Sequence, residues 1–180
     1  MNDQRELSIK VDGEMFVVND EDLTLLDFLR SHVGITSVKD GCSPQGQCGC
    51  CTVLVDGQAR VSCVTPVKRV IGREIETLEG LDNTLKNTWA KAFIDAGASQ
   101  CGFCTPGIIM RFAALQKSGE KTEIEKVKRS LHAHLCRCTG WQTILEAWDD
   151  FGNSEVAIEN DKASERASIE GRTPQKIGFD

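Results

Sequence analysis

The sequence predicts an α+β protein with two small domains and an extended C-terminal tail. Alternating apolar runs with Asp-Gly turns fill the first part, which is typical of hairpins. Helical patterns follow, and the last residues are polar and lack periodicity. We place the boundaries at residues 1–80, 81–152 and 153–180. A chain of 180 residues is long enough for two such domains.

The first domain is predicted to hold two hairpins and a final strand. Residues 7–18 contain two alternating runs that meet at Asp12-Gly13, and residues 51–63 contain two that meet at Asp56-Gly57. Asp-Gly is among the strongest short-range hairpin signals. A last strand is expected near 74–78. These elements would form a small mixed domain in which a sheet packs around one helix.

That helix is predicted for residues 23–32, between the two hairpins. Asp20 and Asp22 precede it and are its capping candidates. Four apolar residues share one helical face: Leu25, Leu26, Phe28 and Leu29.

Four helices are predicted after residue 80, and we expect them to form a four-helix bundle. The segment 107–117 is apolar almost all round, which indicates a buried helix. The expected boundary residues are, in chain order, Asn83 and Gly97, Thr105 with Pro106, Thr122 with Glu125 as a capping box, and Trp141 with Phe151.

Eight of the nine cysteines form two sets of four, the ligand number of a [2Fe–2S] cluster. Thiolate sulfur also suits the soft iron of such a cluster. The sequence therefore predicts an electron carrier with two redox centres in series. The first quartet is Cys42, Cys48, Cys51 and Cys63, and the second is Cys101, Cys104, Cys136 and Cys138.

The spacing supports iron–sulfur ligation in both quartets. Cys42, Cys48 and Cys51 nearly match the plant-type ferredoxin spacing, and the glycines of that loop permit tight turns and close backbone approach. Cys101 and Cys104 fall at the start of a predicted helix, whose partial positive charge favours thiolates.

Some alternatives stay open at this point. Cys50 fits the ferredoxin spacing less well than Cys51, so we expect it to be a small buried residue, although the two could exchange roles. Four cysteines could also bind zinc. His132 and His134, close to Cys136, raise the possibility of a Rieske-type centre with mixed ligands.

Composition excludes several classes of protein. A net charge of −6 argues against a nucleic-acid partner. No apolar run reaches the length of a membrane span, and the N-terminal residues do not resemble a signal peptide, so we expect a cytoplasmic protein. The sequence also lacks a phosphate loop, a dinucleotide-binding fingerprint and a pattern for nucleophilic catalysis.

The segments DGC, GQCGCCTVLVDG, QCGFCTPG and CRCTGW together resemble the iron–sulfur (small) subunit of the molybdenum hydroxylases, the xanthine dehydrogenase and aldehyde oxidoreductase family. The resemblance covers residues from about 5 to 152. It implies a β-grasp ferredoxin-like domain followed by a four-helix domain, each with one [2Fe–2S] cluster. The chain would then be the electron-transfer subunit of an oxidoreductase.

The resemblance also implies partners and an electron route. A large subunit would hold molybdopterin cytosine dinucleotide, and a further subunit would hold FAD. Electrons would pass from molybdenum to the helical-domain cluster, then to the ferredoxin-like cluster, then to FAD. Gln100 and Cys138 would lie beside the pterin. The alternative role for Gln100 is a polar cap on the loop before the cluster.

Three departures from the family pattern are visible. Five residues, where the family usually has four, separate Cys42 from Cys48, Cys50 replaces a small residue, and Trp141 replaces a Tyr. The competing functions are a free-standing two-cluster ferredoxin that diffuses between partners and a zinc-stabilised interaction module.

Overall fold

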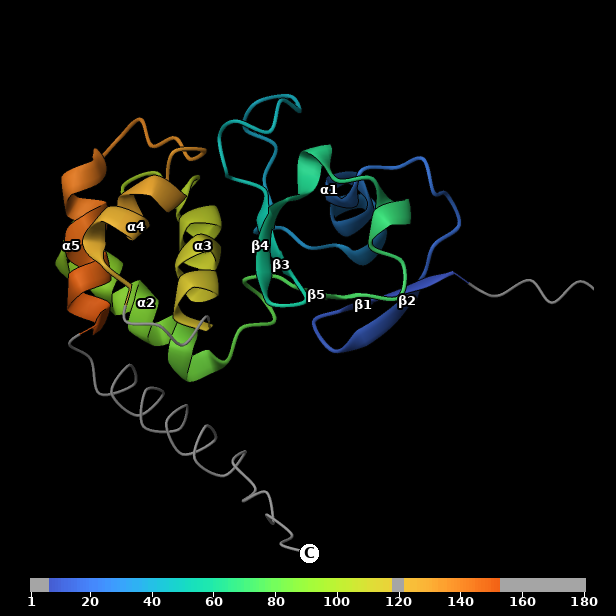
Figure 1. The fold of residues 1–180 in the computed structure, drawn as a ribbon, viewed down its shortest axis with the longest axis horizontal. Helices are drawn as coiled ribbons and strands as arrows, with labels where there is room; N and C mark the ends of the chain where they lie inside the picture. The colour runs from blue at the N-terminus through green and yellow to red at the C-terminus, as the bar shows by residue number, and fades with distance from the viewer. Residues whose placement is uncertain (1–6, 118–121, 153–180) are drawn as a thin grey trace, which may run out of the picture.

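The computed structural model describes residues 7–117 and 122–152, and it has the predicted α+β architecture (Figure 1). A mixed sheet forms the first part, with the strand order β2-β1-β5-β3-β4. β1 and β5 pair in parallel, and the other neighbours are antiparallel. The strands are β1 (Ser8–Val11), β2 (Glu14–Val17), β3 (Thr52–Val55), β4 (Gln58–Val61) and β5 (Glu74–Glu76).

Both predicted hairpins are present. Asp12 and Asp56 have φ angles of 49° and 48°, and the glycines that follow them have φ angles of 92° and 77°. A two-residue turn between right-twisted strands needs positive φ at both central positions, which Asp tolerates and Gly adopts freely. The strand signal near 74–78 was also correct, although β5 already ends at Glu76.

The helix of the first part, α1 (Leu25–Phe28), continues as a π-helical turn, Leu29–Val33. Its N-cap is Thr24, whose side chain accepts a hydrogen bond from Asp27 N–H at 3.1 Å. The predicted caps Asp20 and Asp22 were wrong, because the Asp20 carboxylate accepts from Asp22 N–H in a local turn instead. The apolar face packs on the sheet, and its core includes Ile9, Leu25, Phe28, Leu29, Val53 and Ile75.

Four helices follow, as predicted; the last starts at Trp141 as expected, but the starts of the other three differ from the prediction. They are α2 (Asn83–Asp95), α3 (Thr105–Lys117), α4 (Ile124–Ser130) and α5 (Trp141–Gly152). Asp82 rather than Asn83 caps α2, since its carboxylate accepts from the N–H groups of Thr84 and Leu85.

The other two predicted starts also shift. Thr105 is the first residue of α3 rather than its cap. The capping box of Thr122 and Glu125 was wrong: Glu123 is the N-cap of α4, makes no side-chain capping bond in the described structure, and Glu125 pairs with Lys128.

The helices pack around an aromatic core. Trp89 of α2 stacks on Phe151 of α5, with ring centroids 3.8 Å apart and planes 7° apart. Phe112 of α3 and Trp148 of α5 complete the group, with centroids 5.0 Å apart. None of the helices in the described ranges is long and apolar enough to cross a membrane.

Strand β3 joins the two parts, because both of its faces are buried. Val53 and Val55 point into the core that the sheet shares with α1, whereas Leu54 belongs to the core of the helices. Figure 1 shows α3 beside β3 and β4, on the side away from α1. Lys117, at the end of α3, forms an ion pair with Glu76 of β5. The two parts therefore share an interface built on the sheet.

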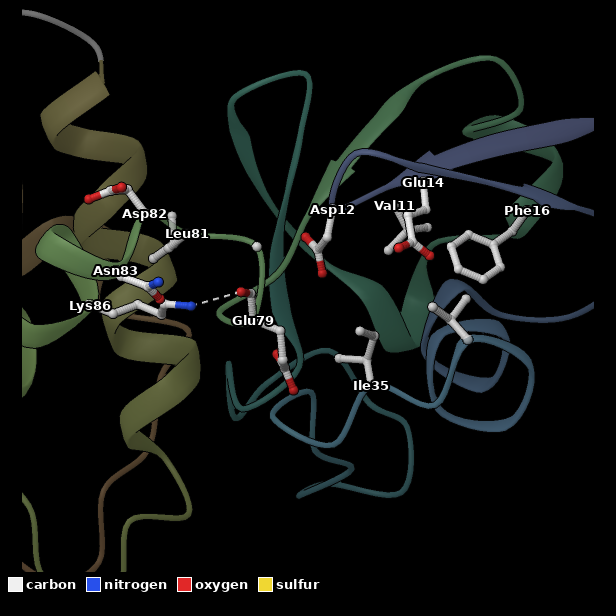
Figure 2. A pocket seen from close by; sticks show the side chains of 12 residues that line it. Val11, Asp12, Glu14, Phe16, Ile35, Glu79, Leu81, Asp82, Asn83 and Lys86 are labelled. Atoms are coloured by element: carbon white, nitrogen blue, oxygen red, sulfur yellow. Dashed lines mark hydrogen bonds between the residues drawn. The ribbon is translucent and has the colours of Figure 1, made fainter.

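The connection between β5 and α2 is held by side-chain hydrogen bonds, of which Figure 2 shows the one from Lys86 to Glu79. The Asp12 carboxylate accepts from the N–H and the hydroxyl of Thr77, at 2.7 and 2.6 Å. Glu79 accepts from Ser37 N–H at 2.9 Å, and Lys86 donates to the Glu79 carbonyl oxygen at 2.9 Å. A cavity of about 510 Å³ opens here, and no cysteine lines it. It is therefore separate from both quartets.

We expect the Asp12–Thr77 contact to stabilise the junction. Asp12→Ala should lower the free energy of unfolding by about 1–3 kcal/mol, because the fully buried Thr77 then loses an acceptor. Asp12→Asn is the matched control, because it keeps an acceptor oxygen and tolerates the positive φ. Anaerobic urea denaturation followed by circular dichroism measures both. Equal losses for the two variants would contradict this role for the carboxylate.

Candidate iron–sulfur centres

Three cysteines of the first quartet lie in the loop before β3, and the fourth, Cys63, lies just after β4. Gly46 and Gly49 have φ angles of 68° and 69°, so the loop makes the turns that its glycines predicted. The Cys42 thiol lies next to that of Cys48, and the Cys51 thiol lies next to that of Cys63. Cys42 is partly exposed, whereas the other three are buried. The structure therefore brings all four predicted ligands together, in two pairs.

Backbone N–H groups point at the sulfur of Cys42. The N–H of Gln45 lies 3.3 Å from it. Together with the N–H of Gln47, which has the largest effect, it lowers the pKa of Cys42 to about 6. Burial instead raises the pKa of Cys63 to about 12. A loop that donates hydrogen bonds to sulfur stabilises the added negative charge of a reduced cluster.

The second quartet joins the start of α3 to the connection between α4 and α5. Cys101 and Cys138 are exposed, and their sulfurs lie 3.5 Å apart. Cys104 and Cys136 are partly buried, and their thiols lie next to each other. Burial, with a smaller effect of the Cys136 thiol, raises the pKa of Cys104 to about 12.

Cys136 has the strongest donors of the second quartet. The Thr139 hydroxyl lies 3.2 Å from its sulfur. Burial opposes ionisation, but this hydroxyl and the N–H groups of Thr139 and Cys138 together lower the pKa of Cys136 to about 7. In Cys101, the N–H of Phe103 likewise lowers the pKa. Both quartets thus contain thiols that ionise readily.

The pairing of the thiols is the geometry that a two-iron cluster needs. In a tetrahedral site with metal–sulfur bonds of about 2.3 Å, two sulfur ligands lie roughly 3.8 Å apart. The Cys101–Cys138 separation of 3.5 Å fits one such edge. Among the described residues, no three His, Cys, Asp or Glu side chains converge in the arrangement of a single-ion site. The thiols of each quartet lie in pairs, an arrangement compatible with the predicted [2Fe–2S] cluster.

Cys50 lies between the two quartets. Its thiol is buried, donates toward the Cys48 carbonyl oxygen at 3.7 Å, and has the thiols of Cys48, Cys104 and Cys51 as neighbours. Burial is the main reason that its pKa rises to about 12. The pairing of Cys51 with Cys63 supports the prediction that Cys51, rather than Cys50, is the ligand.

The histidines and Gln100 occupy different positions relative to the quartets. His134 is buried, and its Nε2 lies 3.3 Å from Oγ1 of Thr52, the first residue of β3, directly after Cys51. Burial, followed by the charge of Arg111, lowers the pKa of His134 to about 4. His132 is exposed and lines a surface groove with Trp141. Gln100 is exposed beside Cys101.

Sequence reasoning missed the residues that let the two loops meet. Gly107 and Gly49 lie against each other, and the Thr139 hydroxyl reaches a ligand sulfur. The proximity of Thr139 to Cys136 in the sequence was a usable signal for a hydrogen bond to sulfur. A glycine in the first turn of an apolar helix was a weaker signal for close packing.

Comparison with known families identifies both parts of the chain. Residues 9–68 match the family described as "2Fe-2S iron-sulfur cluster binding domain", and residues 77–149 match the family described as "[2Fe-2S] binding domain". The two matches divide the chain between the sheet part and the helical part, and each contains one complete quartet.

Relatives of known name occur as separate subunits and as parts of longer chains. The xanthine dehydrogenase iron-sulfur-binding subunit of Escherichia coli O157:H7 is 43% identical over 81% of this chain and 94% of its own. The xanthine dehydrogenase of Blastobotrys adeninivorans is 36% identical over 96% of this chain but only 13% of its own length. The solved structure of quinoline 2-oxidoreductase from Pseudomonas putida 86 superposes with a TM-score of 0.71, at 35% identity over 89% of this chain and 96% of that one.

The ligand assignment predicts different results for two adjacent cysteines. Cys50→Ala should leave the electron paramagnetic resonance (EPR) signals of both reduced clusters in place, because the predicted first quartet is complete without the Cys50 thiol, although that thiol lies next to Cys48. Cys51→Ser should remove or alter one signal. The reverse pattern would show that the two residues exchange roles.

The Thr139 hydroxyl should raise the reduction potential of the cluster bound by the second quartet. Thr139→Val removes this donor to Cys136, which destabilises the reduced cluster and should lower its potential by tens of millivolts. Thr139→Ser keeps the hydroxyl and should keep the potential close to that of the unmodified chain. Redox titration followed by EPR measures the shift, and an unchanged potential in Thr139→Val would contradict the role.

Proposed function

Because this chain belongs to the family of iron–sulfur subunits of molybdenum hydroxylases, we propose that it passes electrons from a molybdopterin centre through two [2Fe–2S] clusters to a flavin. The molybdopterin cytosine dinucleotide would lie on a large subunit, and the FAD on another. The chain is thus a subunit of an oxidoreductase, and the substrate chemistry takes place on its partner.

The observation that carries this proposal is the pair of complete thiol quartets on one continuous fold. A [2Fe–2S] cluster supplies a centre that takes up and releases one electron at a time. The first quartet, Cys42, Cys48, Cys51 and Cys63, would hold one cluster in a β-grasp ferredoxin-like domain. The second, Cys101, Cys104, Cys136 and Cys138, would hold the other in a four-helix domain.

The protein's own groups have three tasks in this function. The loop N–H groups at Cys42 and the Thr139 hydroxyl at Cys136 stabilise the added charge of the reduced state. Burial of Cys48, Cys51 and Cys63 keeps water from the first centre. The rigid sheet and helices fix the separation of the two centres.

The difference in exposure between the quartets supports the proposed direction of electron flow. Cys101, Cys138 and Gln100 are exposed together at one side of the helical part. This arrangement is compatible with a partner subunit that contacts Gln100 and Cys138 with its pterin. We therefore propose that the second quartet faces the molybdenum centre and the first faces the flavin.

The remaining parts of the proposal concern domains, tail and location. We keep the domain boundaries at 1–80 and 81–152 and a cytoplasmic location. The tail, 153–180, lies outside the described residues, and we propose that it contacts the large subunit.

Isolation of the chain with its natural partners tests the proposed function. Metal and sulfide analysis should give about four Fe and four sulfide per chain, the content of two [2Fe–2S] clusters. Native mass spectrometry should show a complex with a molybdenum-containing subunit. Magnetic splitting of the Mo(V) EPR signal should come from the cluster of the second quartet alone.

Each readout has an outcome that contradicts a different part of the proposal. Stoichiometric zinc in place of iron would support a zinc-stabilised module. A chain that carries both clusters but purifies without partners would support a diffusible ferredoxin. Splitting of the Mo(V) signal by the first cluster would reverse the proposed order of the two centres.

A further inference from the structure

Cys50 is the cysteine that belongs to neither quartet, and its thiol lies beside a predicted ligand of the first. The side chain is only 4% exposed. Its neighbours are the thiols of Cys48, Cys104 and Cys51, and of these Cys48 has the largest effect on its pKa. The family that the chain resembles has a small residue at this position, so this thiol is an addition to the ligand pattern.

The space beside Gly41 shows how the sulfurs of Cys48 and Cys50 are arranged. A Cβ atom on Gly41 would lie 3.0 Å from the Cys48 sulfur and 3.3 Å from the Cys50 sulfur. Cε1 of the Phe103 ring would lie 3.1 Å from the same atom. The two sulfurs therefore border one small space, which the Phe103 ring closes on another side. Both cysteines are buried, so water has little access to their contact.

The proton of the Cys50 thiol has two acceptors to choose between, because it rotates about the Cβ–S bond. One is the Cys48 carbonyl oxygen, at 3.7 Å from the Cys50 sulfur. This oxygen already accepts from the N–H of Leu135 at 3.0 Å. The other is the Cys48 sulfur, which carries negative charge when it binds iron. Hydrogen bonds to charged acceptors are the stronger ones, so the sulfur is the better acceptor.

Cys50 also stays protonated, as a donor must. Burial raises the pKa of its thiol to about 12. A negatively charged cluster beside it would hold the proton more firmly, because a nearby negative charge disfavours the thiolate. The neutral thiol is thus the form that faces Cys48 at neutral pH.

We propose that the Cys50 thiol donates a hydrogen bond to the sulfur of Cys48 and thereby raises the reduction potential of the first cluster. The inference rests on the proposed function. Hydrogen bonds to the ligand sulfurs are among the groups that set the potential of an iron–sulfur cluster, and they strengthen when the cluster gains negative charge. Cys50 acts through Cys48 and does not itself bind iron.

This hydrogen bond favours the proposed direction of electron flow. One electron leaves the second cluster, which is oxidised, and reduces the first. The proton stays on the Cys50 sulfur, and no bond breaks. Because the hydrogen bond is stronger when the first cluster is reduced, it shifts the equilibrium toward the electron on that cluster, from which the flavin would receive it.

Cys104 is the competing acceptor, since its thiol is also a neighbour of Cys50 and belongs to the second quartet. A hydrogen bond to Cys104 would raise the potential of the second cluster and hold the electron there. The position of both sulfurs beside Gly41 favours Cys48. The two acceptors predict opposite changes in the equilibrium between the clusters, so one measurement distinguishes them.

Two substitutions at one position form a matched pair. Cys50→Ala removes the donor, and Cys50→Ser replaces the thiol with a hydroxyl, which also donates. Both side chains are smaller than that of Cys, so any effect of lost packing is shared. The complex is isolated with its natural partners, and a redox titration followed by EPR gives the potential of each cluster. Cys51→Ser identifies the signal that belongs to the first.

We expect Cys50→Ala to retain both EPR signals and to lower the potential of the first cluster alone. The equilibrium constant for electron transfer from the second cluster to the first should fall about threefold or more, the size expected for one net hydrogen bond. Cys50→Ser should stay close to the unmodified complex.

A second measurement observes the proton itself. After exchange into D2O, electron–nuclear double resonance of the reduced first cluster should show one deuteron fewer in Cys50→Ala than in the unmodified complex. Cys50→Ser should retain this deuteron. A residue that served only to fill space would not change this coupling, and the measurement on the unmodified complex and Cys50→Ser remains decisive if Cys50→Ala loses a cluster.

Three results would overturn the inference. The first is an unchanged potential of the first cluster in Cys50→Ala. Equal falls in Cys50→Ala and Cys50→Ser would assign the effect to packing, and a change confined to the second cluster would identify Cys104 as the acceptor. Fewer than two clusters in the unmodified chain would instead refute the proposed function itself, so the two failures are distinguishable.

Discussion

The contact of Gly49 with Gly107 and His134 is the constraint on which the arrangement of the two centres depends. Both glycines are needed for space, since a side chain on either would overlap the opposite backbone or ring. Gly49 has the further requirement of a positive φ. Because Gly107 lies three residues after Cys104 and Gly49 lies between Cys48 and Cys51, this one contact sets the spacing between the quartets.

The rest of the fold holds that contact in place from both sides. The sheet presents both faces of β3, so that α1 packs on one and α3 on the other. At the far end of α3, the Lys117–Glu76 ion pair links the helix to β5. The position of the α3 N-terminus over the first loop is therefore set by a rigid helix on a rigid sheet.

The negative charge of the thiolates is stabilised by nearby hydrogen-bond donors rather than by salt bridges. The chain has a net charge of −6, and the thiolates add to it. Backbone N–H groups and one hydroxyl serve as the donors to Cys42, Cys101 and Cys136. The N–H donors are fixed by the backbone, and none of these donors is a flexible cationic side chain. At the interface between the two parts of the chain, burial lowers the pKa of His134 and keeps it neutral. Its ring therefore packs against Gly49 without adding a charge.

The same distinction between local and distant determinants explains how far the sequence predicts the structure. Hairpins at Asp12-Gly13 and Asp56-Gly57 depend on two adjacent residues, and both were correct. The predicted helix caps were wrong where several polar residues lie close together in the sequence. Thr24 rather than Asp20 caps α1, and Asp82 rather than Asn83 caps α2. The Gly49–Gly107 contact joins residues far apart in the sequence, and each glycine alone had a sufficient local explanation. The sequence predicts which thiols gather because their spacing follows a known pattern, but the contact between the two loops is a tertiary property.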